Sequence, residues 1–461
     1  MSQTSSVEKK STLLVASIAS FITPFMGSAI NIALPTIGIS FSADAITLSW
    51  VATAYLLTVA IFLIPFGRIA DIYGRKKIFL YGIILFTLAS FFSGLAPSIN
   101  ILIFFRVLQA IGSAMIFSAS VAIITSVFPE KERGGAMGIA VSAVYLGLSL
   151  GPFLGGLLTQ HLGWRSIFFS VIPVGLIAIY FVLTKLKNEW ADSKGEPFDW
   201  GGSLLYATAL FFIMIGFPKL PETLGITYLT VGIVFLLVFI WLELRLKFPV
   251  LELQLFKNNI IFRYSNLAAL INYMSTFAIA FLLSFYLQYF KELDPQSAGF
   301  VLVSQPIIMA IFSPWAGRLS DRIDPQIISS IGMAISVLGL SLLAFISAET
   351  SLLYIILVLM LLGLGFALFS SPNSNSIMSS VEKKHLGIAS ASLGTTRMIG
   401  QMFSMGIAMM LFSHYIGQNS INTSNLPQLL KSIQTAFIIF AFLSFLGVFA
   451  SLARGKRLKK A

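Results

Sequence analysis

The stretch FGRIADIYGRKK, from Phe66 to Lys77, sets four cations and one carboxylate between two long apolar runs. The chain around it is 57% hydrophobic and 10% charged, whereas soluble domains carry about 25% charged residues. A helix needs about 20 apolar residues to cross a bilayer, and a barrel strand needs about 9–11. The apolar runs here match the helix length. We therefore predict an all-α polytopic membrane protein, with this stretch as a loop between two spans.

Backbone groups inside lipid must form hydrogen bonds within the protein, so each apolar run is expected to be a helix. Hydropathy divides the chain into fourteen such predicted transmembrane helices. The predicted spans are 12–35, 47–67, 78–96, 100–127, 135–160, 165–186, 201–218, 225–245, 261–290, 297–317, 326–347, 351–372, 385–413 and 432–453. The stretch SSPNSNS, residues 370–376, is expected to end the twelfth span or to break it near a cavity.

The 30 Lys and Arg residues are distributed very unevenly across this topology. Arg106 and Arg397 fall inside spans, and nearly all other cations fall on the side of the N-terminus. The few on the opposite side are Arg165, Lys219, Lys291 and Lys431. Cytoplasmic loops carry excess Lys and Arg, so we predict a multi-pass protein of the plasma membrane with both termini in the cytoplasm. This bias explains the net charge of +12 without a nucleic-acid partner. It also explains the basic tail, for which contact with lipid headgroups is a second interpretation.

The Gly-Arg-x-x-Asp spacing of the opening stretch recurs after the tenth span, in PWAGRLSDRIDP. The repeat predicts two six-helix halves, an arrangement typical of transporters that bind substrate between the halves. The predicted divisions are 1–186 for the first bundle, 187–258 for a linker with two additional spans, and 259–461 for the second bundle and basic tail.

Several motifs resemble those of the major facilitator superfamily, and specifically its fourteen-helix drug:proton antiporter branch. GRIADIYGRKK resembles the cytoplasmic loop signature of the superfamily. Five further stretches are similar: RVLQAIGSA (106–114), GLSLGPFLGG (147–156), GWRSIFFSVIPVG (163–175), FDWGG (198–202) and PVLELQLFKNNIIF (249–262). The sequence departs from the branch in its first helix, where Met26 in FMGSAINIALP stands in place of an acid.

The resemblance implies a secondary active transporter that exports amphipathic drugs or metabolites by alternating access, with protons as a candidate coupling ion. No enzymatic activity, cofactor or metal is expected. The sequence has no cysteine, and its three histidines lie far apart.

None of the 18 acidic residues is predicted in the middle of a span, although intramembrane carboxylates are the usual proton relays. Either an acid at the rim, Asp44 or Asp71, takes the proton, or coupling differs or is absent. The second hypothesis gives an alternative function, proton-independent transport of a polar or anionic metabolite. A membrane receptor or scaffold that does not transport is a third hypothesis, from another class.

The two embedded arginines are the first candidates for substrate contact. Arg106 and Gln109 are spaced i, i+3, and Arg397 and Gln401 are spaced i, i+4, so each pair shares a helix face. Each arginine either enters a central cavity or fixes helix packing by bonding to neighbouring helices. The other candidates for a polar cavity are Asn31, Tyr55, Asn266, Asn272, Tyr273 and Gln288.

A second group of residues is predicted to gate the transporter. Gly67 and Gly74 are expected to form a tight turn, which lets Asp71 reach the N-terminus of the helix that begins near His385 and latch the cytoplasmic gate. The remaining gating candidates are Arg68, Arg75, Gly317, Arg318 and Asp321. Hinge residues are expected at Gly147, Gly151, Pro152, Gly155 and Gly156, where ordinary close packing of small residues is the alternative.

Overall fold

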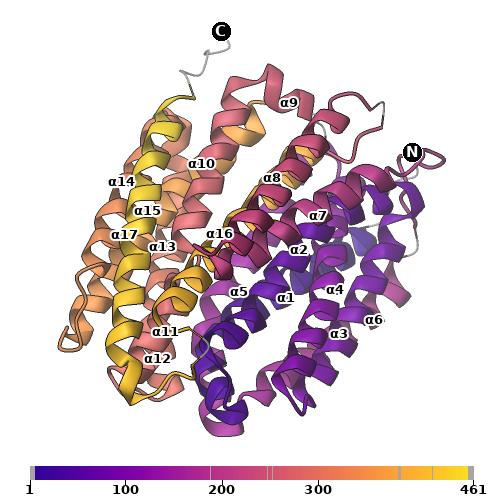
Figure 1. The fold of residues 1–461 in the computed structure, drawn as a ribbon. Coiled ribbons are helices and arrows are strands. Elements are labelled where there is room, and N and C mark those ends of the chain that lie inside the picture. The colour runs from indigo at the N-terminus through magenta and orange to yellow at the C-terminus, as the bar shows by residue number, and fades with distance from the viewer. Residues whose placement is uncertain are drawn as a thin grey trace. The chain divides into compact units, whose positions relative to one another are not determined.

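The computed structural model describes residues 6–186, 188–246, 248–251, 253–382, 386–417 and 419–454. In these ranges the regular elements are α-helices and two short 3₁₀ turns, so the predicted all-α fold is confirmed (Figure 1). Their bounds are α1 Ser6–Phe41, α2 Ala45–Tyr73, α3 Arg75–Gly94, α4 Ile99–Val127, α5 Glu130–Leu162, α6 Arg165–Lys185, α7 Trp200–Gly216, η1 Phe217–Lys219, α8 Thr223–Glu243, α9 Leu253–Asn258, α10 Ile260–Thr276, α11 Ile279–Tyr289, α12 Pro295–Leu302, α13 Ser304–Arg322, α14 Pro325–Leu343, α15 Leu352–Ser379, α16 Leu386–Tyr415, η3 Thr423–Asn425 and α17 Leu426–Leu452.

Each predicted span has a helical counterpart. Within the described ranges, thirteen helices are long and apolar enough to cross a membrane, and the 30-residue α16 accounts for the remaining predicted span. Two spans are interrupted, since α10 passes into α11 at Phe277 and α12 into α13 at Val303. The twelfth span neither ends nor breaks at residues 370–376 as expected. Instead α15 continues through Pro372 to Ser379.

Polar side chains fix several helix starts. The side chains of Ser98, Asn259 and Ser351 each accept a hydrogen bond from the backbone amide three residues later. Asp294 caps α12 in the same way, through the Ser297 amide. Such caps satisfy backbone donors that a helix leaves unpaired at its first turn.

The chain forms two compact units. Unit 1 contains Met1–Ala43, Trp50–Ile213 and Thr230–Leu251, and unit 2 contains Asp44–Ser49, Met214–Leu229 and Glu252–Ala461. Segments of the predicted linker 187–258 therefore fall in both units. The three-part domain division stays a prediction.

Each unit contains a helix pair that crosses through facing glycines. In unit 1, α3 meets α4 at Gly82 and Gly112, and a Cβ on Gly82 would lie 2.9 Å from the Gly112 carbonyl oxygen. In unit 2, α14 meets α15 at Gly332 and Gly365, where the corresponding distance is 2.6 Å. Small residues allow such close backbone approach in membrane helices. The presence of the same glycine-mediated helix contact in both units agrees with the predicted internal repeat.

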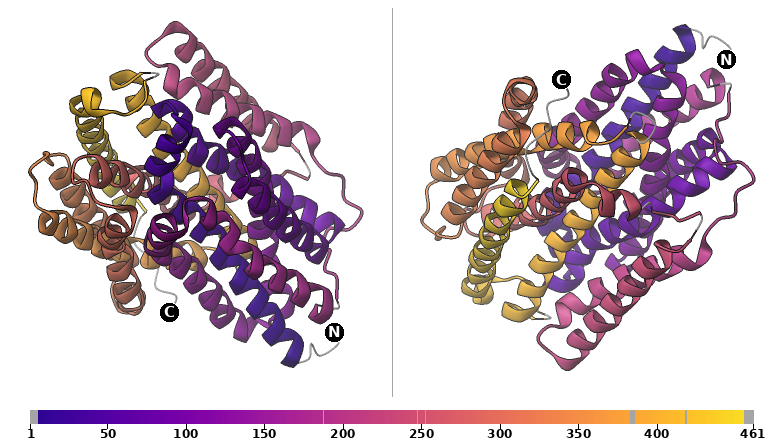
Figure 2. Two further views of the ribbon diagram at one scale, coloured as in Figure 1. Left: turned by 90° about the horizontal axis from the view of Figure 1, so that it is seen from below. Right: turned by 90° about the horizontal axis from the view of Figure 1, so that it is seen from above.

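The two additional spans, α7 and α8, form a helical hairpin that is drawn in pink in both views of Figure 2. The Phe212 and Phe235 rings stack across it with centroids 6.3 Å apart. Apolar side chains such as Ile233, Val234 and Leu237 on α8 are exposed. A helix that exposes so much apolar surface is suited to contact with lipid.

Candidate functional site

The first polar cluster lies inside unit 1, around Arg106 on α4. Its Nε donates to the Val51 carbonyl oxygen at 3.1 Å, and its Nη1 donates to Gln109 Oε1. The guanidinium carbon lies 4.2 Å from the centroid of the Tyr55 ring. Arg106 is 0% exposed, so these contacts offset part of the large cost of burying a charge among membrane helices.

The same cluster extends to two serines. Gln109 Nε2 donates to Ser90 Oγ at 2.7 Å, and the Tyr55 hydroxyl lies 2.6 Å from Ser113 Oγ. Only Nη2 of Arg106 has no hydrogen-bond partner among the described residues. The contacts of Arg106 thus support a packing role inside unit 1. Its Nη2 is the one guanidinium nitrogen that remains available to a ligand.

The second polar cluster lies inside unit 2, where α10 packs against α16. The Arg397 guanidinium lies 5.4 Å from the centroid of the Tyr273 ring, which brings these two candidates together. Asn266 has partners on both helices, because its Nδ2 donates to the Phe262 carbonyl and its Oδ1 accepts from Thr396 Oγ1. Gln401 lies one turn after Arg397 and is 6% exposed.

Asn272 lies on the same helix, α10, but differs from Asn266 in the hydrogen bonding of its side chain. It is 0% exposed, and neither its Oδ1 nor its Nδ2 has a partner in the part of the chain that the structure describes. An unsatisfied buried polar group costs about 1–3 kcal/mol. Its amide is therefore the strongest candidate for contact with a polar ligand among the predicted cavity residues of unit 2.

The remaining cavity candidates are more dispersed. Asn31 Oδ1 on α1 is buried without a partner among the described residues. Gln288 on α11 donates to Ser284 Oγ of its own helix at 3.1 Å.

The gating stretch Phe66–Lys77 is helical except at Gly74, because α2 ends at Tyr73 and α3 begins at Arg75. The predicted loop is therefore a one-residue turn. Gly74 has φ +120°, a value that favours glycine. Gly67 lies inside α2 and makes no turn, so that part of the expectation is wrong. Asp71 and Arg75 form an ion pair at 2.7 Å, and Arg75 forms a second one with Asp192 at 2.7 Å.

Sequence reasoning missed the segment that docks on this turn. Arg68 donates to Ser193 Oγ and pairs with Glu196. The Glu189 carboxylate accepts from the Lys76 amide and packs against Gly74. The signal was the acid-rich run NEWADSKGE, residues 188–196, on the cation-rich side of the predicted topology. Acids there neutralise the loop cations.

The latch predicted for Asp71 stays a prediction. His385 lies outside the described residues, and the helix that Asp71 would reach, α16, is described from Leu386. Asp71 itself is held by Arg75 within unit 1. In the repeated motif, Gly317 and Arg318 lie on α13, and a Cβ on Gly317 would lie 2.9 Å from Ser371 Oγ on α15. The side chain of Asp321 is not among those described.

The hinge candidates lie on α5, which is helical through Pro152 and also contains Gly156. On this helix Gly151 packs against Ser28 of α1, and a Cβ on Gly155 would lie 2.8 Å from the Ala29 carbonyl oxygen. Gly147 packs in the same way against the Phe21 carbonyl oxygen. These contacts support close packing of α1 against α5.

A pair of neighbouring carboxylates, one buried and one half-buried, was also missed. Glu243 ends α8 at 3% exposure, and its Oε2 accepts from the Leu251 amide at 2.8 Å. Its Oε1 and Asp199 Oδ2 both converge on Gly202, where an added Cβ would collide with each. Neither oxygen has a partner among the described residues. Two adjacent carboxylates disfavour double ionisation, so the pair is suited to share a proton.

Together, the helical spans, the repeated motif and the buried polar cluster in each unit define a membrane transporter of the two-half helical class. A sequence profile described as the Major Facilitator Superfamily matches residues 16–254 and 266–460. The chain belongs to this superfamily, and it is a transporter rather than an enzyme.

Relatives support the assignment over most of the chain. The riboflavin transporter RibZ of Clostridioides difficile is 34% identical over 430 residues, which cover 93% of this chain and 91% of that protein. The multidrug resistance protein Stp of Mycobacterium tuberculosis is 32% identical, covering 86% and 74%. The tetracenomycin C resistance and export protein of Streptomyces glaucescens is 27% identical, covering 88% and 76%.

Solved structures share the fold at low sequence identity. A bacterial homologue of the human lysosomal transporter Spinster aligns with a TM-score of 0.67 and 17% identity, covering 98% of each chain. The D-xylose-proton symporter aligns with a TM-score of 0.67 and 13% identity, covering 96% of this chain and 97% of that one.

Proposed function

We propose that this protein exports amphipathic organic compounds from the cytoplasm by alternating access, as a member of the fourteen-helix drug:proton antiporter branch. It would lie in the plasma membrane with both termini in the cytoplasm, in keeping with the cation distribution. The relatives named as multidrug resistance and export proteins support efflux, and the riboflavin transporter supports a heteroaromatic substrate.

The observation that carries the substrate class is the unpartnered Asn272 amide. Tyr273 follows it on α10, and Arg397 lies over the Tyr273 ring. An amide offers both a donor and an acceptor, and an aromatic ring with a cation beside it suits a flat π-system. We infer a substrate with a flat ring whose edge carries donors and acceptors.

Carboxylates are the usual proton acceptors in transporters, and the three candidates here differ in their surroundings. Asp44 caps α2, with Oδ1 accepting from the Ile46 and Thr47 amides and Oδ2 accepting from Thr47 Oγ1. Asp71 is paired with Arg75. The Asp199–Glu243 pair retains unpartnered oxygens, which makes it the best-suited proton acceptor of the three.

The buried arginines favour a second candidate function, proton-independent transport of a polar or anionic metabolite. Arg106 and Arg397 place positive charge among membrane helices, and no described acid lies in the middle of a span to balance it. Such a site would favour neutral or anionic compounds over cations.

Transport by purified protein in proteoliposomes separates the two candidates. Riboflavin and a lipophilic cationic dye would serve as probes, with a pH gradient imposed in either direction. Proton antiport predicts that flux reverses with the gradient and that substrate entry releases protons into the external buffer. Flux of riboflavin that ignores the gradient would select the proton-independent alternative. A receptor or scaffold would show no flux above protein-free liposomes.

A further inference from the structure

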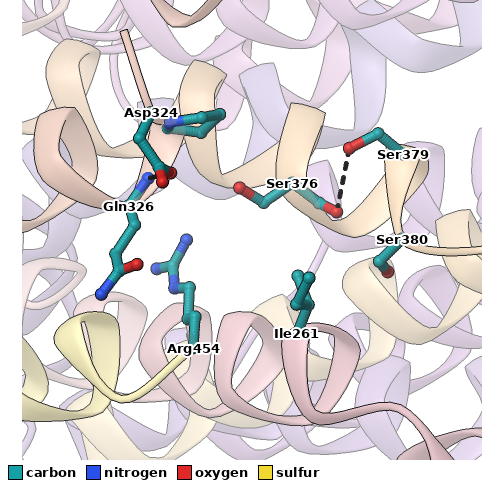
Figure 3. Close-up of a pocket in the computed structure, with 8 residues that line it drawn as sticks. Ile261, Asp324, Gln326, Ser376, Ser379, Ser380 and Arg454 are labelled. Atoms are coloured by element: carbon teal, nitrogen blue, oxygen red, sulfur yellow. Dashed lines mark hydrogen bonds between the residues drawn. The ribbon is translucent and has the colours of Figure 1, made fainter. Parts of the chain in front are cut away.

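A small cavity lies at one end of unit 2, where four helices end or begin (Figure 3). The start of α10 contributes Ile261, the start of α14 contributes Asp324 to Gln326, and the end of α15 contributes three serines. Arg454 follows α17 and completes the lining. The proposed topology puts this end on the cytoplasmic side, because the α13–α14 connection and the C-terminal tail both carry cations.

Arg454 is the unexplained group in this cavity. It is 2% exposed, and Nε, Nη1 and Nη2 all lack a hydrogen-bond partner in the described part of the chain. Burial lowers the pKa of its guanidinium to about 9, with Asp324 acting in the opposite direction. A buried charge is costly unless it is paired, so three unpartnered guanidinium nitrogens at the wall of a cavity indicate an anionic ligand.

The surrounding framework holds Arg454 in place. Gln326 Nε2 donates to the Leu452 carbonyl at 2.5 Å, and Ser330 Oγ donates to Ser451 Oγ at 2.9 Å. These bonds tie the end of α17 to the start of α14. In Figure 3 the Ser376 hydroxyl points toward the same space as the guanidinium, which adds a neutral donor to the site.

Asp324 also points into this space, and it opposes an anion. It makes no ion pair with Arg454 among the described residues, and its Oδ1 accepts from the Gln326 amide at 3.0 Å. Asp324 is therefore the N-cap of α14, where the helix dipole balances part of its charge. Asp324 therefore attracts Arg454 without supplying a hydrogen-bond acceptor to its guanidinium among the described residues.

The size and the location of the cavity limit which anions could bind there. The cavity measures about 30 Å³, room for roughly two oxygen-sized groups by the volume a buried water needs. A guanidinium binds two oxygens of a phosphate through parallel hydrogen bonds. The site follows the last apolar turn of α17, whose Phe449 and Leu452 are exposed. The sequence then continues GKRLKK, without an acid. Basic segments at this depth attract anionic lipids of the cytoplasmic leaflet.

We propose that Arg454 and Ser376 bind the phosphate oxygens of an anionic phospholipid headgroup, which links the ends of α15 and α17 to the start of α14. The site lies within unit 2 and does not depend on the substrate or on proton coupling. A phosphodiester carried by the membrane surface fits a cavity that admits only the oxygens of its ligand.

The test measures thermal unfolding of the purified full-length protein against added phosphatidylglycerol, phosphatidylcholine or inorganic phosphate. Phosphatidylglycerol should raise the midpoint in a saturable manner, while the other two leave it unchanged. An equal effect of phosphatidylcholine would overturn headgroup recognition. An equal effect of inorganic phosphate would overturn the lipid as the source of the anion.

Three variants locate the effect. Arg454→Gln should weaken the apparent affinity for phosphatidylglycerol about tenfold, as expected for loss of a bidentate charged pair. Arg457→Gln removes one tail cation and should change this affinity less than about twofold, because Arg457 is not among the residues that line the cavity and three other tail cations remain. Asp324→Asn keeps a capping side chain and should tighten binding. Equal losses in Arg454→Gln and Arg457→Gln, or weaker binding in Asp324→Asn, would overturn the site.

Discussion

Asn266 and Asn272 lie on the same helix, α10, and are both buried, yet only Asn266 is satisfied. Asn266 bonds to the Phe262 carbonyl and to Thr396 Oγ1, whereas the amide of Asn272 has no partner among the described residues. A satisfied amide contributes to packing, and an unsatisfied one weakens it. The contrast separates a structural asparagine from a candidate ligand contact.

Asn272→Leu should abolish or strongly reduce transport without lowering stability. Leucine has a similar volume, and replacement of an unsatisfied buried amide by an apolar group is neutral or stabilising. The unfolding midpoint of the purified protein and the KM for transport in proteoliposomes check the two expectations. A stable variant with unchanged KM would remove Asn272 from the site.

Asn266→Leu is the matched control on the same helix. It removes one hydrogen bond within α10 and one to Thr396 of α16. A hydrogen bond between membrane helices is worth about 0.6 kcal/mol on average. We expect a lower unfolding midpoint and an unchanged KM in the protein that remains folded. A raised KM with unchanged stability would place Asn266, rather than Asn272, at the substrate.

Arg106→Gln should destabilise unit 1. The shorter side chain removes the bonds to the Val51 carbonyl and to Gln109 Oε1. The Val51 carbonyl keeps its helical partner in α2, whereas Gln109 Oε1 loses its donor, and an unsatisfied buried acceptor costs about 1–3 kcal/mol. Thermal unfolding and the amount of monodisperse protein after extraction measure the loss. Full stability together with a lost preference for neutral or anionic substrates would instead assign Arg106 to the substrate.

Gly155→Ala should loosen the contact between α1 and α5. The added Cβ would press on the Ala29 carbonyl oxygen of α1, and such overpacking typically costs about 1–3 kcal/mol. Gly138→Ala on the same helix α5 is the control, because a Cβ there meets nothing within 4 Å. Equal unfolding midpoints for the two variants would contradict close packing at Gly155.

Asp71→Asn should impair transport while expression survives. The change removes the charge that Arg75 faces at 2.7 Å and the anion of the proposed latch. Asp192→Asn removes the other ion-pair partner of Arg75. Because the Asp192 side chain is 71% exposed, this change should have little effect on transport. Flux in membrane vesicles, normalised to protein amount, measures both. Full activity of Asp71→Asn would remove the latch.

The sequence was sufficient to predict the helical spans and the loop signature, because hydropathy and the Gly-Arg-x-x-Asp repeat are local patterns. It also placed Arg106 beside Gln109 and offered close packing of small residues as the alternative to a hinge at Gly151, without indicating that α1 is the partner. It could not show that Glu243 and Asp199 converge, or that the segment containing Asp192 docks on the α2–α3 turn. Those contacts join residues far apart in sequence, and hydropathy treats each acid as an ordinary exposed residue.

Flux of riboflavin into proteoliposomes, compared between the unaltered protein and Asn272→Leu, tests the central claim most directly. We predict saturable flux above protein-free liposomes, accelerated by unlabelled substrate on the opposite side, and lost in a stably folded Asn272→Leu variant. Flux that neither saturates nor responds to substrate on the opposite side, or that is equal in the two proteins, would contradict alternating-access transport through this site.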